Sequence, residues 1–165
     1  MNLLIEVFDS PCGQISIVFD EVETLYHLDF PDQGDRQVRM LHKRFKDLKL
    51  MKGQSKMIRG HILSYMSGKF DQVEQIRCSM GGTDFQNRVW QALRAIPVGK
   101  TCSYSDIAVQ IGHEKAVRAV ARANALNPVS ILYPCHRVIA RDGSLRGYAG
   151  GVGRKNWLLR HEGAI

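Results

Sequence analysis

The chain of 165 residues contains no long apolar run, and this absence limits where the protein can work. No stretch approaches the roughly 20 apolar residues that a membrane-spanning helix needs. The opening residues, Met1 to Glu6, have no basic leader, and their apolar run is too short for a signal peptide. We therefore expect no membrane association and predict an intracellular protein, cytoplasmic, or nuclear if the source is a eukaryote.

Closely spaced cysteine pairs are also missing. The four cysteines, Cys12, Cys78, Cys102 and Cys135, show no Cys-x-x-Cys spacing of the kind found in zinc knuckles. A reducing compartment disfavours disulfides between them. We predict four thiols and no metal site. Repeats and low-complexity tracts are absent as well, so the length fits one domain or two small ones.

Positive charge is in excess, with 23 Lys and Arg against 16 Asp and Glu, a formal net charge of +7 and a pI near 9.4. Such a balance favours a polyanionic partner such as nucleic acid, although many basic proteins bind none.

The first half of the chain alternates strand-like and helical patterns. Segments 3–8, 14–19 and 24–30 read as strands of an antiparallel meander. Segments 37–50 and 55–66 have the apolar spacing of helices, with Gly68 ending the second. The basic run within 43–52 has two interpretations, a DNA contact or a solvated helix face, and the second is favoured.

A domain boundary is predicted at Gly81-Gly82, which precedes a helix capped by Thr83 or Asp84. The domains are then residues 1–82 and 83–165. Apolar residues at helical spacing follow the boundary, up to the stop at Pro97.

Two short helices at 104–111 and 114–126, separated by Gly112-His113, have the pattern of a helix-turn-helix. The second would place Val120 on its packed face, and Arg118 and Arg122 on the opposite face. Its positive face suits nucleic acid, but many helix pairs bind nothing.

The motif Tyr133-Pro-Cys-His-Arg-Val138 carries the strongest chemical signal. A thiol with a pKa of about 8.5 is mostly protonated at neutral pH, so a nucleophilic cysteine needs a nearby base or cation. His136 and Arg137 supply both beside Cys135. An inert cysteine after a buried apolar run is the alternative.

The segments around this motif resemble the active-site region of the O6-alkylguanine-DNA alkyltransferases, also named methylated-DNA–protein-cysteine methyltransferases. The resemblance rests on Asn127-Pro128, the Pro-Cys-His-Arg-Val core, the glycine-rich stretch 143–151 and the stretch 154–163, and it spans residues 83–163. It implies an α+β fold, in which a small ribonuclease H-like amino-terminal domain precedes a mostly helical domain with a helix-turn-helix.

The resemblance also implies a function. A DNA repair protein of this kind flips O6-alkylguanine out of the duplex and transfers its methyl or other small alkyl group irreversibly to Cys135, once per molecule. O4-alkylthymine is an alternative substrate. The implied partner is double-stranded DNA bearing the lesion. No cofactor and no obligate protein partner are implied, and we expect a monomer.

Residue roles follow from the same resemblance. In the relay, His136 takes the thiol proton and Glu162 orients the imidazole. The implied catalytic residues are Cys135, His136, Glu162, Tyr104 and Asn127. The implied DNA-binding residues are Arg118, Ala119, Ser103 and Arg137, and we add Arg122, an extra cation where relatives often carry a smaller residue. The implied base-pocket residues are Tyr148, Ala149, Gly150 and Val138, and we add Arg146, which lies two residues before Tyr148 where relatives usually have a small or hydroxylated residue.

Two rival functions stay open from the residues. A cysteine hydrolase would use Cys135, His136 and Glu162 to turn over an ester, although its cysteine and histidine are usually far apart in sequence. A damage sensor or transcriptional regulator would bind DNA without chemistry, but we expect it to lack Cys135.

Overall fold

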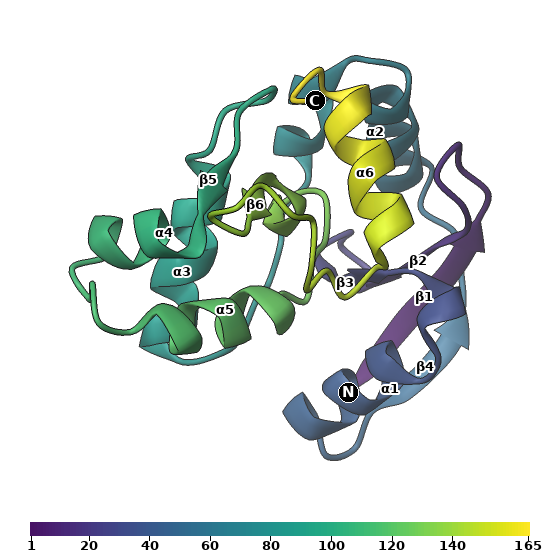
Figure 1. Cartoon of the computed structure of the whole chain (residues 1–165). Coiled ribbons are helices and arrows are strands. Elements are labelled where there is room, and N and C mark those ends of the chain that lie inside the picture. The colour runs from purple at the N-terminus through teal and green to yellow at the C-terminus, as the bar shows by residue number, and fades with distance from the viewer. The chain divides into compact units, whose positions relative to one another are not determined.

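In the computed structural model, which describes residues 1–165, the chain divides into two units, Met1–Gly81 and Gly82–Ile165 (Figure 1). Strands and helices occur in both units. The predicted α+β class is confirmed. None of the helices combines the length and the apolar character that crossing a membrane requires.

The first unit is built on a four-stranded sheet. Strands β1 (Asn2–Phe8), β2 (Ile15–Phe19) and β3 (Leu25–Asp29) form the predicted antiparallel meander. Strand β4 (Lys49–Lys52) then joins the free side of β1 in parallel, so the strand order is β3-β2-β1-β4.

The predicted helical segment 37–50 was wrong over residues 45–50. Helix α1 spans Arg36–Arg44 and ends where Phe45 becomes extended. Beyond it, Leu48 and Leu50 pack on a core that contains Leu3 and Leu41. Pairing with β1 packs these two leucines against the core, and this tertiary contact outweighs the helical spacing of the segment. A local window of sequence cannot reveal that pairing.

The remaining elements of this unit are η1 (Pro31–Gln33), α2 (Lys56–Met66) and η2 (Phe70–Gln75). Ser55 caps α2 because its hydroxyl accepts a hydrogen bond from the Ile58 N–H at 3.0 Å. Gly68 follows the helix with φ 96°, a conformation suited to glycine, so the predicted helix end is confirmed.

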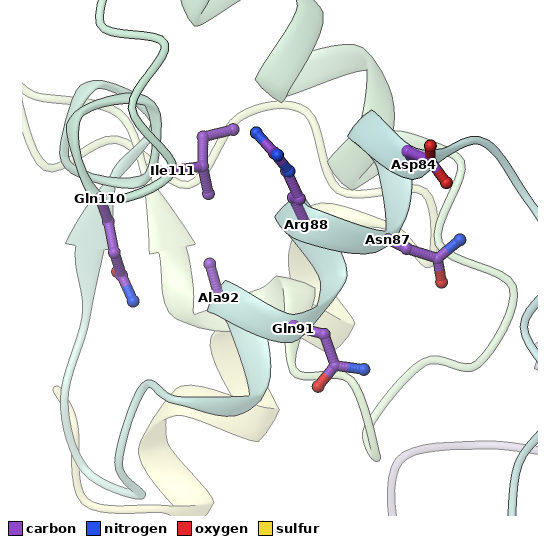
Figure 2. A pocket seen from close by; sticks show the side chains of 7 residues that line it. All are labelled: Asp84, Asn87, Arg88, Gln91, Ala92, Gln110 and Ile111. Carbon is purple, nitrogen blue, oxygen red and sulfur yellow. The ribbon is translucent and has the colours of Figure 1, made fainter.

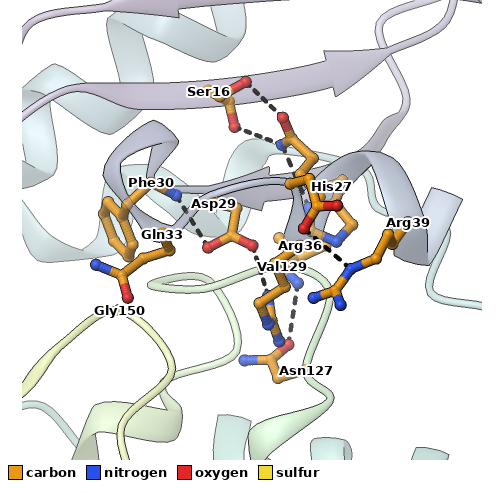
Figure 3. A network of polar contacts seen from close by, with 12 residues as sticks. Ser16, His27, Asp29, Phe30, Gln33, Arg36, Arg39, Asn127, Val129 and Gly150 are labelled. Atoms are coloured by element: carbon orange, nitrogen blue, oxygen red, sulfur yellow. Dashed lines mark hydrogen bonds and ion pairs between the residues drawn. The ribbon is translucent and has the colours of Figure 1, made fainter.

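A buried polar network joins α1 to the sheet (Figure 3). The Ser16 hydroxyl contacts Gln37 Oε1 at 2.6 Å, and Gln37 Nε2 lies 3.3 Å from His27 Nδ1. Beside it, Arg36 binds Asp29 at 2.5 Å. His27 Nε2 is buried and has no protein partner. Burial, followed by the charges of Arg36 and Arg44, lowers the pKa of His27 to about 3.

The second unit contains four helices and a two-stranded parallel pair. Its elements are α3 (Asp84–Arg94), β5 (Cys102–Ser103), α4 (Tyr104–Gln110), α5 (Val117–Ala125), η3 (Cys135–Arg137), β6 (Val138–Ile139) and α6 (Val152–His161). The predicted cap at Thr83 is present as a capping box with Gln86. The Trp90 indole N–H donates to the Ala123 carbonyl at 2.9 Å and ties α3 to α5.

Gly82 begins this unit in a conformation that a larger residue would strain. Its φ is 77°, and a Cβ there would lie 2.6 Å from the Trp90 ring. Both the backbone conformation and the close approach of the indole therefore require glycine.

We predict that His27 makes the free energy of unfolding depend on pH. Between pH 6.5 and about 3, His27 binds a proton in the unfolded chain but stays neutral in the folded chain. The free energy of unfolding therefore falls as the pH falls, by up to about 1.4 kcal/mol per pH unit. Denaturant unfolding of wild type and His27→Gln at pH 4, 5, 6 and 7 measures this slope. The variant should show a slope smaller by about one proton. Parallel curves for the two proteins would contradict the assignment.

Candidate active site

Cys135 lies at the start of η3, at the end of an irregular loop that follows α5. Its side chain is buried, with 4% of the residue exposed. All four cysteines are thiols. Of these, Cys135 alone lies next to a histidine in the sequence, while the pKa of the half-buried Cys102 is raised to about 11 by burial and by Asp106.

The side chain of Glu162 is shared by the two residues that follow Cys135. His136 Nε2 lies 2.6 Å from Glu162 Oε1. Arg137 donates from Nε to Oε2 at 2.8 Å and from Nη2 to Oε1 at 3.0 Å. The third guanidinium nitrogen, Nη1, donates to the Ile96 carbonyl at 2.6 Å. A buried carboxylate with this many donors is ionised and held in one orientation.

This arrangement sets the protonation of His136. The Glu162 carboxylate accepts a hydrogen bond from the Nε2–H group, which leaves Nδ1 as the basic nitrogen. Nδ1 is buried and has no protein partner. Complete burial lowers the pKa of His136, against the opposing effect of Glu162. The imidazole is therefore neutral at pH 7 and able to accept a proton.

Lys155 is a fully buried cation that the sequence prediction missed. Its Nζ donates to the Val138 carbonyl at 2.5 Å and lies 6.0 Å from the centre of the Tyr148 ring. Burial lowers the pKa of Lys155, and the negative charge of Cys135 raises it. The ammonium is therefore close enough to the sulfur to interact with a thiolate.

A signal for Lys155 was present in the sequence. Residues 155, 158, 159 and 162 recur at helical spacing, and in α6 and its C-cap all four are buried. No helix was predicted over this segment, which entered the analysis of the sequence only through the family resemblance, and Lys155 was given no role.

Tyr104 belongs to the same cluster. It is the first residue of α4, and both burial and the charge of Cys135 raise its pKa. A Cβ added to Gly147 would lie 3.5 Å from the Tyr104 hydroxyl, so the glycine-rich loop approaches this oxygen closely. At neutral pH the phenol keeps its proton and can donate it.

Asn127 braces the loop in front of the cysteine. Its Nδ2 donates to the Tyr133 carbonyl at 2.7 Å, and its Oδ1 accepts from the Val129 N–H at 3.0 Å. Both ends of the buried amide are therefore used within the loop, so Asn127 fixes the backbone that leads to Cys135.

Two three-residue turns carry the chain from Asn127 to Cys135. The Cys135 N–H donates to the Tyr133 carbonyl at 2.7 Å around Pro134, with φ −80° and ψ 68°, which is the common inverse γ-turn. The Leu132 N–H donates to the Ser130 carbonyl at 2.9 Å around Ile131, which has φ 74°. This second turn is the rare, strained form of γ-turn, and a β-branched residue at its centre adds to the strain.

The predicted DNA-binding residues fall into two groups. Arg118, Ala119 and Arg122 are exposed on α5, whereas Val120 and Ala123 of the same helix are buried. Ser103 caps α4, in a capping box with Asp106. Arg137 requires a correction, because only 7% of it is exposed and its guanidinium is bound to Glu162 and Ile96. A side chain held in this way belongs to the buried network and cannot act as a DNA contact.

The predicted pocket residues also differ from one another in how exposed they are. Tyr148, Gly150 and Val138 are buried, and Ala149 is partly buried. Arg146 is exposed, and its guanidinium contacts Ser144 at 3.0 Å and Asp142 at 3.6 Å within its own loop.

A separate surface hollow of about 670 Å³ lies beside α3 and the end of α4 (Figure 2). Polar side chains such as Asn87, Arg88 and Gln91 line it, and none of the cluster around Cys135 does. It therefore plays no part in the chemistry of that thiol. Nowhere do three or more His, Cys, Asp or Glu side chains gather in a way that could hold a metal ion.

Comparison with known proteins gives a consistent result. Residues 84–164 match the family model described as the DNA-binding domain of 6-O-methylguanine DNA methyltransferase. A methylated-DNA–protein-cysteine methyltransferase of Salmonella typhimurium is 42% identical over 168 aligned positions, covering 100% of this chain and 98% of the relative. One from Methanosarcina barkeri is 39% identical, with 95% of each chain covered.

Solved structures agree. The crystal structure of the Mycobacterium tuberculosis O6-methylguanine methyltransferase is similar with a TM-score of 0.82 and 36% identity, covering 98% of this chain and 93% of that one. A crystal structure of the Mycobacterium tuberculosis protein in complex with DNA has a TM-score of 0.80 and 36% identity, with 99% and 94% covered.

We predict that Ile131→Gly is at least as stable as Ile131→Ala. Both variants lose a buried side chain, at a cost of about 2–5 kcal/mol for truncation to Ala. Glycine normally costs about 0.5–1 kcal/mol relative to alanine, but at a positive φ it avoids a penalty of about 1–2 kcal/mol. Denaturant midpoints of the two variants test the order. A clearly more stable Ala variant would show that this turn is not strained.

Proposed function

Because the chain belongs to the methylated-DNA–protein-cysteine methyltransferase family, we propose that it repairs DNA by moving a methyl or other small alkyl group from guanine O6 to Cys135. The observation that carries the proposal is the buried imidazole of His136, held by Glu162 through Nε2 with Nδ1 left basic, directly after the thiol. Alkylated thymine O4 presents the same kind of alkyl–oxygen bond and is a second candidate substrate.

The reaction begins with loss of the thiol proton. His136 Nδ1 accepts it through a bridging water molecule, and Glu162 stabilises the imidazolium that forms. The thiolate then attacks the alkyl carbon in line with the bond to O6. As the new S–C bond forms, the C–O6 bond breaks, and its electron pair stays on the guanine.

Charge balance in the buried site favours the thiolate. With neutral His136, the site holds the Glu162 carboxylate and two cations, Arg137 and Lys155, and Lys155 is in no ion pair with a carboxylate. A cluster with one excess positive charge is stabilised by one anion in its midst. The Cys135 thiolate is that anion, and Lys155 is the residue we assign to stabilising it.

The departing guanine also needs stabilisation. Tyr104 is protonated at neutral pH because its pKa is raised, so its hydroxyl can donate to the base as negative charge develops. Tyr148 and the backbone of Ala149 and Gly150 would enclose the base, and this enclosure requires the base to leave the duplex.

Duplex binding is assigned to the second unit by its charge. Residues 82–165 carry 12 Lys and Arg against five Asp and Glu, so the second unit accounts for the whole net charge of +7. In α5 the small Ala119 lets the backbone approach DNA between Arg118 and Arg122. We assign Arg118 to the space that the flipped base leaves and Arg122 to a phosphate.

The product limits each molecule to one reaction. An S-alkyl cysteine is a thioether, which offers water no activated leaving group, unlike the thioester of a cysteine hydrolase. The reaction needs no cofactor, because the electrophilic carbon comes with the substrate. We propose that the protein works inside the cell, where its DNA substrate lies.

Transfer of radiolabelled methyl from O6-methylguanine duplex to the protein tests the function. The wild type should take up about one group per molecule and then stop, and peptide mapping should find the label on Cys135. Cys135→Ala should take up none, whereas the matched control Cys102→Ala should react like wild type. Labelling of Cys135→Ala, or continuous turnover of an ester by the wild type, would contradict the proposal.

The two arginines of α5 should separate into different roles. Arg118→Ala should slow repair of duplex at least about tenfold more than reaction with free O6-methylguanine, since a few kcal/mol of unstacking stays uncompensated. Arg122→Ala should instead lower the salt dependence of duplex binding, by about 0.9 in the slope of log K against log salt. Equal losses of Arg118→Ala on both substrates would place that residue in the pocket or the fold.

A further inference from the structure

The charges of the first unit are sharply separated along the chain. Residues 1–35 contain eight Asp and Glu and no Lys or Arg. Residues 36–59 contain nine Lys and Arg and a single acid, Asp47. Residues 1–81 carry 11 charges of each sign and are neutral as a whole. The net charge of the unit therefore does not reveal its basic segment.

The arginines of the basic part serve the fold. Arg36 pairs with Asp29 at 2.5 Å, Arg39 with Asp35 at 3.2 Å, and Arg59 with Glu6. Arg44 donates to the carbonyl and the hydroxyl of Ser79, both at 2.8 Å. Their charges are used within the unit.

The lysines are not used in this way. Lys43, Lys46, Lys49 and Lys52, which we name the lysine strip, are all exposed and form no ion pair. They run from the end of α1 through the connection to β4 and along β4 itself (Figure 1).

The strip is held on an ordered backbone. Leu48 and Leu50 lie between its lysines and pack on the core with Leu3 and Leu41. Strand β4 is at the edge of the sheet, so one of its sides faces no strand. Lys49 and Lys52 are three positions apart, so their side chains leave the strand on opposite faces and flank its open edge, about 10 Å apart along the strand. A polyanion laid against this edge can meet both.

The chemistry of the strip fits a phosphate backbone. Lysine acts as a point charge without the bidentate geometry that reads bases, so such a surface binds without sequence preference. Duplex DNA offers one charge per about 1.7 Å of axis. Lysines on an edge strand have a second explanation, because they also prevent pairing with other chains.

We propose that the lysine strip is a second, sequence-independent contact for the phosphates of duplex DNA, on the unit that does not carry Cys135. The inference rests on the proposed function, which makes DNA the polyanion that the protein meets. The contact would add affinity for DNA around a lesion and leave the alkyl transfer step itself unchanged.

The test is the salt dependence of binding to undamaged duplex. Lys49→Gln with Lys52→Gln should reduce the slope of log K against log salt by up to about 1.8, or 0.9 for each phosphate that the variant no longer binds. The control, Lys69→Gln with Arg77→Gln, removes the same charge from exposed positions elsewhere in the unit and should leave the slope unchanged. Equal slopes in wild type and the strip variant, or equal reductions in both variants, overturn the proposal.

Further measurements separate the other outcomes. Self-association of the strip variant in sedimentation, with its DNA slope unchanged, would mean that the lysines only protect the edge. Loss of binding to anionic phospholipid vesicles without loss of DNA binding would make the strip a membrane contact. Both results overturn the inference.

Methyl transfer from free O6-methylguanine isolates the chemistry at Cys135, and the strip variant should match wild type there. If the wild type repairs duplex DNA but the wild type and the strip variant have equal salt slopes, only the proposal for the lysine strip is contradicted. If the wild type transfers no methyl group, the proposed function itself is contradicted, whatever the salt slopes are.

Discussion

The buried carboxylate of Glu162 is the interaction on which the site depends. It binds His136 through one oxygen and Arg137 through both, with all three residues at most 7% exposed. Removing Arg137 would leave the buried carboxylate without its ion-pair partner, which typically costs several kcal/mol. Because Glu162 is the C-cap of α6, the same contacts join the end of the chain to η3 and so to Cys135.

Burial then gives each group its chemical state. Desolvation lowers the pKa of His136 and Lys155 and raises that of Tyr104. The lowered pKa keeps the His136 imidazole neutral and basic, and the raised pKa keeps the Tyr104 phenol protonated. The buried site therefore combines a base, a proton donor and a surplus cation around one thiol, which is the combination that a thiolate nucleophile needs.

The approach to the cysteine is set by backbone geometry. Asn127 uses both ends of its amide within the loop, and Ile131 is held at φ 74° by the turn around it. Strain of this kind persists only where the surrounding packing determines the conformation. The loop therefore presents Cys135 from a stiff support, although it contains no regular strand or α-helix.

Much of the architecture was predictable from local patterns. The meander of β1 to β3, the cap at Thr83 and the two helices before the loop follow from alternation, capping residues and glycines. Strand β4 and helix α6 were not predicted. Leu48 and Leu50 fit a helix as well as a strand until β1 lies beside them, and the burial of Lys155 depends on the packing of α6.

The amino-acid sequence by itself determined the candidate nucleophile Cys135, its neighbouring imidazole and the positive face of α5, because each depends on adjacent or helically spaced residues. Only the tertiary structure decided what Arg137 and Lys155 do. Arg137 was predicted to be a DNA contact and Lys155 was given no role, and their partners, Glu162 and the Val138 carbonyl, lie 25 and 17 positions away. The helical spacing of 155 with 158, 159 and 162 indicates that Lys155 is buried, but no local pattern identifies the distant partner of either cation.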